Sequence, residues 1–130
     1  MKLKALTINL MVKNVERSVS FYEKTLGFQT TMTVPGEQGL IFAMIVKDDV
    51  SIMLQTLESF VIDNSAYKNS NAGGTILLYI DVTDIDEVHA MVKKEKVNLY
   101  KEMHETFYGT KEFTIQDPDG YLISFAEDKK

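Results

Sequence analysis

Three side chains that can transfer protons or orient a ligand lie at intervals of four near the end of the chain: His104, Tyr108 and Glu112. Imidazole, phenol and carboxylate groups serve as acids and bases in enzymes, and they also fix bound molecules through hydrogen bonds. On two adjoining strands they would converge at one rim of a sheet. They predict either acid–base chemistry, with Glu112 as base and His104 or Tyr108 as acid, or contact with a ligand. In the alternative interpretation His104 is a surface loop residue and Tyr108 packs over a helix.

Other reactive side chains are few. The chain has no cysteine, which excludes disulfides, thiolate nucleophiles and cysteine-rich zinc sites. The second histidine, His89, follows Ile85 by four residues, so it is predicted to pack at the edge of a helix stripe. One histidine with one or two carboxylates makes a poor transition-metal site. We therefore favour the absence of a metal at His104 and Glu112 over a relocated metal.

The bulk composition favours one small domain, residues 1–130. The chain is 45% apolar with a formal net charge of −5, and an acidic protein has no favourable long-range attraction for nucleic acid or an anionic membrane. The opening MKLKALTINLMV lacks a small-residue cleavage site, and no apolar run approaches the roughly 18 residues of a membrane span. We expect a cytoplasmic protein whose partners include neither nucleic acid nor a membrane.

Apolar periodicity predicts an order of elements that occurs twice. Strands are predicted over residues 5–12, 28–35, 40–46 and 50–56, with a helix that Asn14 caps and Gly27 ends. A short helix over 57–62 and a polar connection over 63–74 follow. The second half then has a strand over 75–82, a helix capped by Asp84, and strands over 97–104, 111–117 and 121–127.

Residues repeat together with the elements. Val12-Lys13-Asn14-Val15 matches Val82-Thr83-Asp84-Ile85 at a constant offset of 70 positions, from 12 to 82. Each half is βαβββ, which divides the domain into modules of about 1–62 and 75–130 with 63–74 as linker. A module of that length buries too little surface to be stable alone, so the two are expected to pack into one unit.

The tetrapeptide Asp117-Pro118-Asp119-Gly120 predicts a tight turn between the last two strands. Aspartate at the first position, proline at the second and glycine at the fourth suit a type I turn. We interpret these four residues as structural.

Two segments, LMVKNVERSVSFYEKTLGF (10–28) and QDPDGYLISFAE (116–127), resemble the vicinal oxygen chelate superfamily. That superfamily includes glyoxalase I, the bleomycin-resistance proteins and extradiol dioxygenases, and HETFYGTKEFTIQDPDGYLISFAE is most similar to the bleomycin-resistance-like branch. The resemblance implies an α+β fold in which two βαβββ modules form an open, cup-like mixed sheet with helices outside.

Together with the alternation, the resemblance assigns the two faces of each strand. Residues expected to meet the helices as core are Leu6, Ile8, Leu10, Leu78, Ile80, Val82, Phe113, Ile115, Tyr121, Ile123 and Phe125. Residues expected to line the cup are Thr7, Asn9, Met11, Ser51, Met53, Gln55, Leu77, Tyr79, Asp81, Glu112, Thr114, Gln116, Leu122, Ser124 and Ala126. This mixed lining predicts a ligand cavity, and a plain solvent-facing sheet is the alternative. The predicted ligand contacts are Thr7, Asn9, Met53, Gln55, Leu77, Tyr79, Asp81, His104, Tyr108, Glu112 and Ser124.

The resemblance also locates the positions at which metal-using relatives carry their ligands. Here they are occupied by Thr7, Met53, Leu77 and Ser124, none of which is a usual ligand for zinc, nickel, iron or manganese. We therefore expect no metal and no cofactor.

These observations favour a metal-free protein that binds a small organic molecule over an enzyme. Asp81, Glu112 and the acidic balance favour a cationic ligand. One alternative is a lyase, isomerase or dioxygenase of glyoxalase type, with a relocated metal or metal-free acid–base chemistry, and another is a surface for protein interaction. The resemblance further implies a homodimer with the ligand at the subunit interface.

Overall fold

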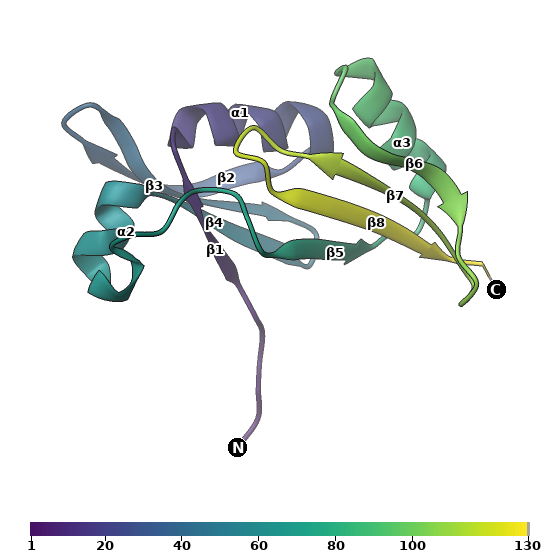
Figure 1. Cartoon of the computed structure of the whole chain (residues 1–130), viewed down its shortest axis with the longest axis horizontal. Helices are drawn as coiled ribbons and strands as arrows, with labels where there is room; N and C mark the ends of the chain where they lie inside the picture. Colours follow the sequence, from purple (N-terminus) through teal and green to yellow (C-terminus); the bar gives the residue numbers. More distant parts are fainter. Residues whose placement is uncertain (130) are drawn as a thin grey trace.

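The computed structural model describes residues 1–129, which form two four-stranded mixed sheets with three α-helices (Figure 1). The first module contains β1 (Ile8–Val12), α1 (Val15–Leu26), β2 (Gln29–Gly36), β3 (Gly39–Lys47) and β4 (Val50–Thr56), in sheet order β1-β4-β3-β2. The second contains β5 (Leu77–Asp81), α3 (Ile85–Lys94), β6 (Leu99–Glu105), β7 (Thr110–Gln116) and β8 (Leu122–Asp128), in order β5-β8-β7-β6. Between the modules lie α2 (Leu57–Asp63) and a 3₁₀ turn, η1 (Ser65–Tyr67). The predicted α+β fold of two βαβββ modules is confirmed, with the strands divided between two sheets.

The predicted helix caps are confirmed. The Asn14 side chain accepts a hydrogen bond from the Arg17 amide at 2.8 Å, and α1 ends at Gly27, whose φ of 77° is left-handed. The Asp84 side chain caps α3 by accepting from the Glu87 amide at 3.1 Å. None of the helices in residues 1–129 has the length and apolar character needed to cross a membrane.

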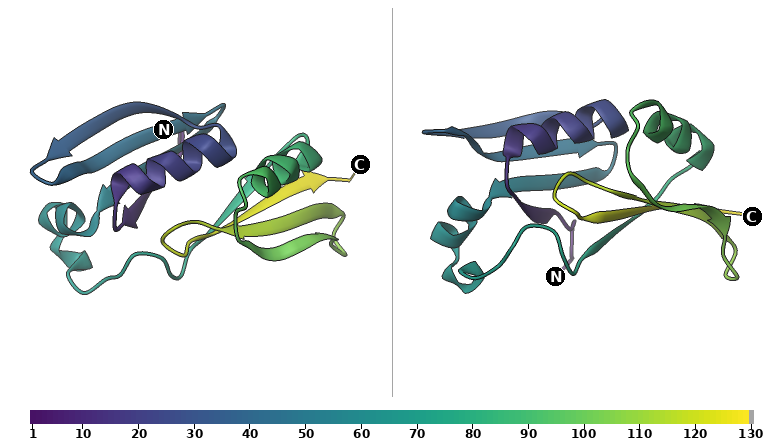
Figure 2. Two further views of the ribbon diagram at one scale, coloured as in Figure 1. Left: turned by 90° about the horizontal axis from the view of Figure 1, so that it is seen from above. Right: turned by 45° about the horizontal axis from the view of Figure 1, so that its top comes forward.

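The hydrophobic core lies between the sheets and two helices that share one side of them. Figure 1 shows α1 and α3 above both sheets, and Figure 2 shows the two helices neighbouring each other across the boundary between the modules, where they are in contact. Each strand alternates, so one face packs under a helix and the other faces away. Core residues predicted and found buried are Leu10, Phe113, Ile115, Tyr121, Ile123 and Phe125, while Ile8, Leu78, Ile80 and Val82 are partly buried against them.

One face assignment was wrong. Leu6 was predicted to be core but is 92% exposed, because β1 begins only at Ile8 and the preceding residues extend away from the sheet (Figure 1). Met11 lies on the same face as its ladder partner Gln55, as assigned, but it is buried there. Its strand lies beside a turn of the second module, where the Tyr121 hydroxyl donates to the Met11 carbonyl at 2.7 Å.

The turn of residues 117–120 is structural, as predicted. The Gly120 amide donates to the Asp117 carbonyl at 3.0 Å, which closes the turn. The Asp117 carboxylate accepts from the amides of Asp119 and Tyr121, both at 2.9 Å. Burial raises the pKa of Asp117, although the hydrogen bond from Tyr22 and those from the turn amides oppose the rise.

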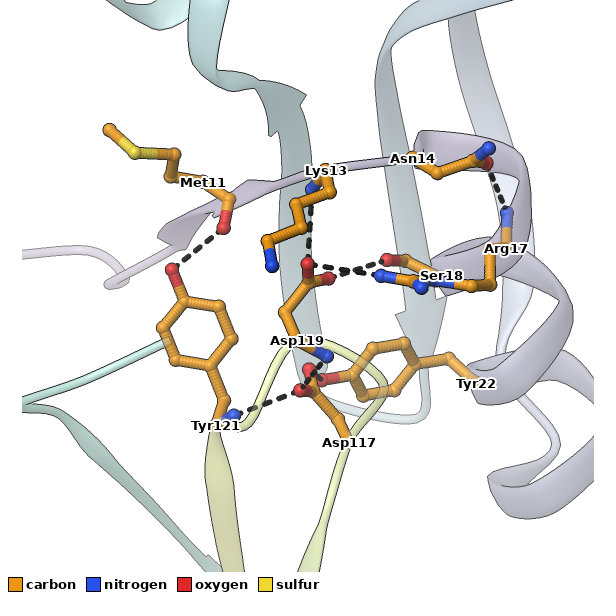
Figure 3. Close-up of polar contacts among 9 residues, drawn as sticks. All are labelled: Met11, Lys13, Asn14, Arg17, Ser18, Tyr22, Asp117, Asp119 and Tyr121. Atoms are coloured by element: carbon orange, nitrogen blue, oxygen red, sulfur yellow. Dashed lines mark hydrogen bonds and ion pairs between the residues drawn. The ribbon is translucent and has the colours of Figure 1, made fainter. Parts of the chain in front are cut away.

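The same turn also joins the two modules, which the sequence did not reveal (Figure 3). The Asp119 carboxylate accepts from the Lys13 amide at 3.0 Å, the Arg17 guanidinium at 3.2 Å and the Ser18 hydroxyl at 3.3 Å, and its side chain is 0% exposed. The buried Tyr22 hydroxyl donates to Asp117 at 2.8 Å. We call this set of contacts between the 117–121 turn and residues 11–22 the clasp. It fixes the second module to the end of β1 and the start of α1.

Candidate functional site

Glu112 is the centre of a polar cluster on the open face of the second sheet. Phe113 next to it is fully buried under α3, so the alternation of β7 directs Glu112 to the opposite face. Three hydroxyl groups donate to the same carboxylate oxygen, Glu112 Oε2. They come from Tyr79 on β5, from Tyr108 before β7 at 3.0 Å and from Thr110 at the start of β7 at 2.8 Å.

The electrostatics of this cluster favour an ionised carboxylate. Burial raises the pKa of Glu112. The hydrogen bonds from Tyr79, Thr110 and Tyr108 together lower it by more than burial raises it, so the net pKa lies below the ordinary value. The hydrogen bond to Glu112 is the main reason that the pKa of Tyr79 rises to about 12. A carboxylate with a lowered pKa is a weaker general base at neutral pH, but it keeps its negative charge. The cluster therefore suits charge recognition better than proton abstraction.

His104 lies beside this cluster, as the sequence suggested. It is the ladder partner of Glu112 across β6 and β7, and its Nδ1 atom is 2.8 Å from the Glu102 carbonyl oxygen. A carbonyl can only accept, so Nδ1 is the donor, which leaves Nε2 as the acceptor in the neutral ring. The structure thus brings His104, Tyr108 and Glu112 together and adds Tyr79. Thr110 was missed, although its position two residues from Glu112 on one strand places both on the same face.

A second polar group lies on the open face of the first module. Asn9 on β1 donates from Nδ2 to Gln55 Oε1 at 2.9 Å, and Gln55 Nε2 donates to Ser59 Oγ and Asp63 Oδ2, both at 2.8 Å. Of these residues, Asn9, Gln55 and Asp63 border a cavity of about 500 Å³ between β1 and the α2–η1 segment. We call it the β1 cavity, and it is lined by Leu6, Thr7, Ile8, Asn9, Gln55, Phe60, Asp63, Asn64 and Tyr67.

The remaining predicted contacts are dispersed. Leu77 and Tyr79 are half-exposed, and Met53 is partly buried. The Ser124 hydroxyl is buried 2.6 Å from that of Thr114. Asp81 borders a different cavity, of about 550 Å³, between the β3–β4 turn and the start of α3. The β1 cavity has no lining residue from β5 to β8, so the predicted lining falls into two separate halves.

A family model described as the Glyoxalase/Bleomycin resistance protein/Dioxygenase superfamily matches residues 4–125. The chain belongs to this superfamily. It is 30% identical over 124 residues to lactoylglutathione lyases of two Neisseria meningitidis strains, which covers 92% of this chain and 87% of theirs.

Solved structures of the superfamily's fold resemble this one along nearly the whole chain. TioX from Micromonospora sp. ML1 has a TM-score of 0.77 at 17% identity, covering 96% of this chain and 98% of TioX. TnmS3, described as an antibiotic-binding protein from Streptomyces sp. CB03234, has a TM-score of 0.75 at 20% identity and covers 98% of both chains. At these identities the similarity shows the fold alone.

The residues present do not fit the divalent metal that some members of the superfamily use. At the positions aligned with the ligands, Leu77 offers no donor atom, Met53 offers a thioether, and the Ser124 hydroxyl is bonded to Thr114. No group of three or more histidine, cysteine or acidic residues in the described part of the chain could hold an ion. His89 is half-buried with its ring edge-on to Phe113 at 5.0 Å, the packing role that its helical spacing predicted.

Proposed function

We propose that this member of the superfamily binds a small, positively charged organic molecule without a metal, and that Glu112 is its anionic contact. The observation that carries the proposal is the arrangement around the carboxylate. Three hydroxyls occupy Oε2, and Oε1 accepts no hydrogen bond from residues 1–129. Within those residues, the buried side-chain atoms without a partner are Asn9 Oδ1 and His89 Nε2, so Glu112 Oε1 retains contact with solvent. One oxygen holds the carboxylate in place and the other is available.

Aromatic rings around the carboxylate support a cationic organic ligand. Tyr79 is 47% exposed and Tyr108 is 57% exposed, and both hold their hydroxyls toward Glu112. A ring face beside a carboxylate attracts a cation through the ring quadrupole, and it also provides apolar contact area for the rest of the molecule. The antibiotic-binding description of TnmS3, which shares the fold, is consistent with such a role.

The first test is a thermal-shift screen of cationic antibiotics, aromatic amines and thiol adducts, with and without divalent metals. A molecule that binds the folded state raises the melting temperature, and the stabilisation grows with the logarithm of one plus its concentration over its Kd. Glu112→Gln should weaken the cationic hits at least tenfold. Glu37→Gln removes the same charge from an exposed position of the first module and should leave their affinity unchanged. Equal binding by wild type and Glu112→Gln would contradict the proposal.

A second candidate, lactoylglutathione lyase activity, is favoured by the 30% identity to the Neisseria enzymes. It predicts turnover that depends on a bound divalent metal and disappears under chelation. Metal content measured on protein purified without added metal, together with an assay for lactoylglutathione lyase activity in added zinc or nickel, distinguishes the two candidates. Near-stoichiometric metal with chelator-sensitive turnover would replace the binding proposal.

We further propose that the binding form is a homodimer. The two halves of the predicted lining lie on different modules, and the open face carries exposed apolar groups, including Leu77 at 52% and Tyr79 at 47%. A second copy that covers these faces would bury them and enclose the ligand. Light scattering coupled to gel filtration should give twice the mass of the chain, and a monomer at micromolar concentration would contradict this part of the proposal.

A further inference from the structure

We infer that the β1 cavity is a subsite for a group that donates hydrogen bonds, specifically a primary ammonium attached to an aromatic or aliphatic body. The inference rests on the proposed small-molecule function and names the chemical group that the first module recognises. Its site is separate from Glu112, which lies on the other module.

The chain of hydrogen bonds beside β1 fixes which side-chain atom of Asn9, a residue of the cavity lining, is left unpaired. The Asp63 carboxylate can only accept, so Gln55 must present its Nε2 group to Asp63, at 2.8 Å. Gln55 Oε1 then faces Asn9, and Asn9 must donate to it from Nδ2, at 2.9 Å. The orientation of both amides follows from the one acidic residue. The remaining atom, Asn9 Oδ1, is therefore an acceptor that lacks a hydrogen-bond donor.

Asn9 Oδ1 is one of the two buried side-chain atoms in residues 1–129 that have no hydrogen-bond partner. A buried polar atom without a partner is costly, and such atoms are rare unless a bound group completes them. Gln55, on which Asn9 depends, is itself 6% exposed and fully engaged, so the orientation cannot relax without breaking bonds to Ser59 and Asp63. The unpaired acceptor is therefore fixed in orientation, within a residue that lines the cavity.

The other lining groups select a cation with an apolar body. Asp63 brings a negative charge that no cation balances in the described residues, and its second oxygen accepts no hydrogen bond there. Phe60 and Tyr67 meet edge-to-face at 5.0 Å and form an aromatic wall, and Ile8 adds apolar surface. The volume of about 500 Å³ suits a small organic molecule.

These features distinguish between classes of ligand group. A primary ammonium has three donors and no acceptor, so it suits a lining in which the unpaired Asn9 Oδ1 and the Asp63 carboxylate are both acceptors, and it can meet the rings through cation–π contact. A ligand carboxylate would face two acceptors and a like charge. A neutral hydroxyl has one donor and gains nothing from the charge.

The test is a titration of ¹⁵N-labelled protein with 2-phenylethylammonium, followed by NMR. The side-chain amide signals of Asn9 and Gln55 should shift saturably, because both groups border the site. 2-Phenylethanol has the same body without the charge and should bind at least tenfold more weakly, and 3-phenylpropionate should produce no shift of these signals. Asp63→Asn should weaken the ammonium at least tenfold, while Asp49→Asn, the same change outside the cavity, should have no effect.

Two outcomes would overturn the inference. One is equal affinity for 2-phenylethanol, and the other is the lack of any shift of the Asn9 and Gln55 side-chain signals at about 10 mM ammonium, a concentration that would detect millimolar binding. Because Asp63→Asn and the alcohol leave Asn9 intact, the result does not depend on an Asn9 variant that folds. Glu112→Gln separates the two proposals: it should leave this titration unchanged, whatever its effect on the hits of the thermal-shift screen.

Discussion

The two modules meet at two corresponding places, and among residues 1–129 hydrogen bonds hold only one of them. At the clasp, the β7–β8 turn inserts Asp119 against the start of α1, where three donors satisfy it (Figure 3). The β3–β4 turn occupies the corresponding place in the first module and faces the start of α3. There the boundary contains the cavity of about 550 Å³, bordered by Asp49 and Glu87.

The repeat explains the difference residue by residue. At the offset of 70 positions, Asp119 corresponds to Asp49, and its partner Arg17 corresponds to Glu87. A carboxylate that meets a guanidinium and a hydroxyl at one junction therefore shares a cavity with a second carboxylate at the other. Tyr22, which donates to Asp117, corresponds to Val92, which has no donor. The backbone plan is shared by both modules, but a few side chains decide whether a junction closes.

Removal of the clasp carboxylate should have the largest effect. Asp119→Ala leaves Ser18 and Arg17 without their partner, and we expect a loss of about 2–3 kcal/mol in the free energy of unfolding, since Arg17 is half-exposed and the ion pair is partly screened. Asp49→Ala, its counterpart, should change stability by less than about 0.5 kcal/mol. Urea unfolding measures both, and equal effects would remove the distinction between the junctions.

Tyr22→Phe should have the next largest effect. It deletes the hydroxyl that donates to buried Asp117 without changing the ring, and it should cost about 1–2 kcal/mol because an acceptor is left short of a donor. Tyr100→Phe is the matched control, because Tyr100 is 65% exposed, and it should be neutral. A neutral Tyr22→Phe would mean that the clasp acts through packing alone.

A decrease in pH should change the stability contributions of Glu112 on the open face and Asp117 in the clasp in opposite directions. The pKa of Glu112 is lowered on folding, so its contribution to stability is present above the ordinary value of 4.5 and is lost as pH falls through the folded value. The pKa of Asp117 is raised, so wild type gains stability from this group as pH falls from the raised value toward the ordinary 3.8. The destabilisation by Glu112→Gln should therefore shrink toward low pH, and that by Asp117→Asn should grow. Parallel profiles between pH 7 and pH 3 would contradict both assignments.

The smallest expected effect is a gain at the open junction. Glu87→Arg places at α3 the residue type that α1 has at Arg17, and a pair with Asp49 should add up to about 0.5 kcal/mol. Glu87→Gln is the control, because it removes the repulsion between Glu87 and Asp49 without supplying a cation to pair with Asp49. Destabilisation by the arginine would show that the cavity cannot accommodate it.

Local sequence signals predicted the elements well because their causes are local. The caps at Asn14 and Asp84, the stop at Gly27 and the 117–120 turn each depend on residues within four positions. The inward direction of Glu112 followed from its alternation with Phe113. The error at Leu6 arose from the same local reasoning. Alternation of residue types does not show at which residue a strand begins to pair with its neighbour, and β1 pairs with β4 only from Ile8.

The parts that could not be predicted depend on contacts between distant residues. Arg17 and Asp119 are 102 positions apart, and Tyr79 and Glu112 are 33 apart. Nothing near Asp119 in sequence indicates that a neighbouring module supplies its donors. The orientation of the amides at Asn9 and Gln55 required Asp63 to be in place, which depends on where α2 begins.

A boundary whose hydrogen bonds in the described residues lie along one side is expected to open first on the other side. The clasp holds the start of α1, whereas the cavity adjoins its other end, near Leu26, about 18 Å away for a helix of 12 residues. Rotation of one sheet about the clasp would change the width of the cavity bordered by Asp49 and Glu87, and the angle between the two open faces, with few hydrogen bonds broken. Such a rotation would let the opening take guests of different size while the clasp keeps the two modules in register.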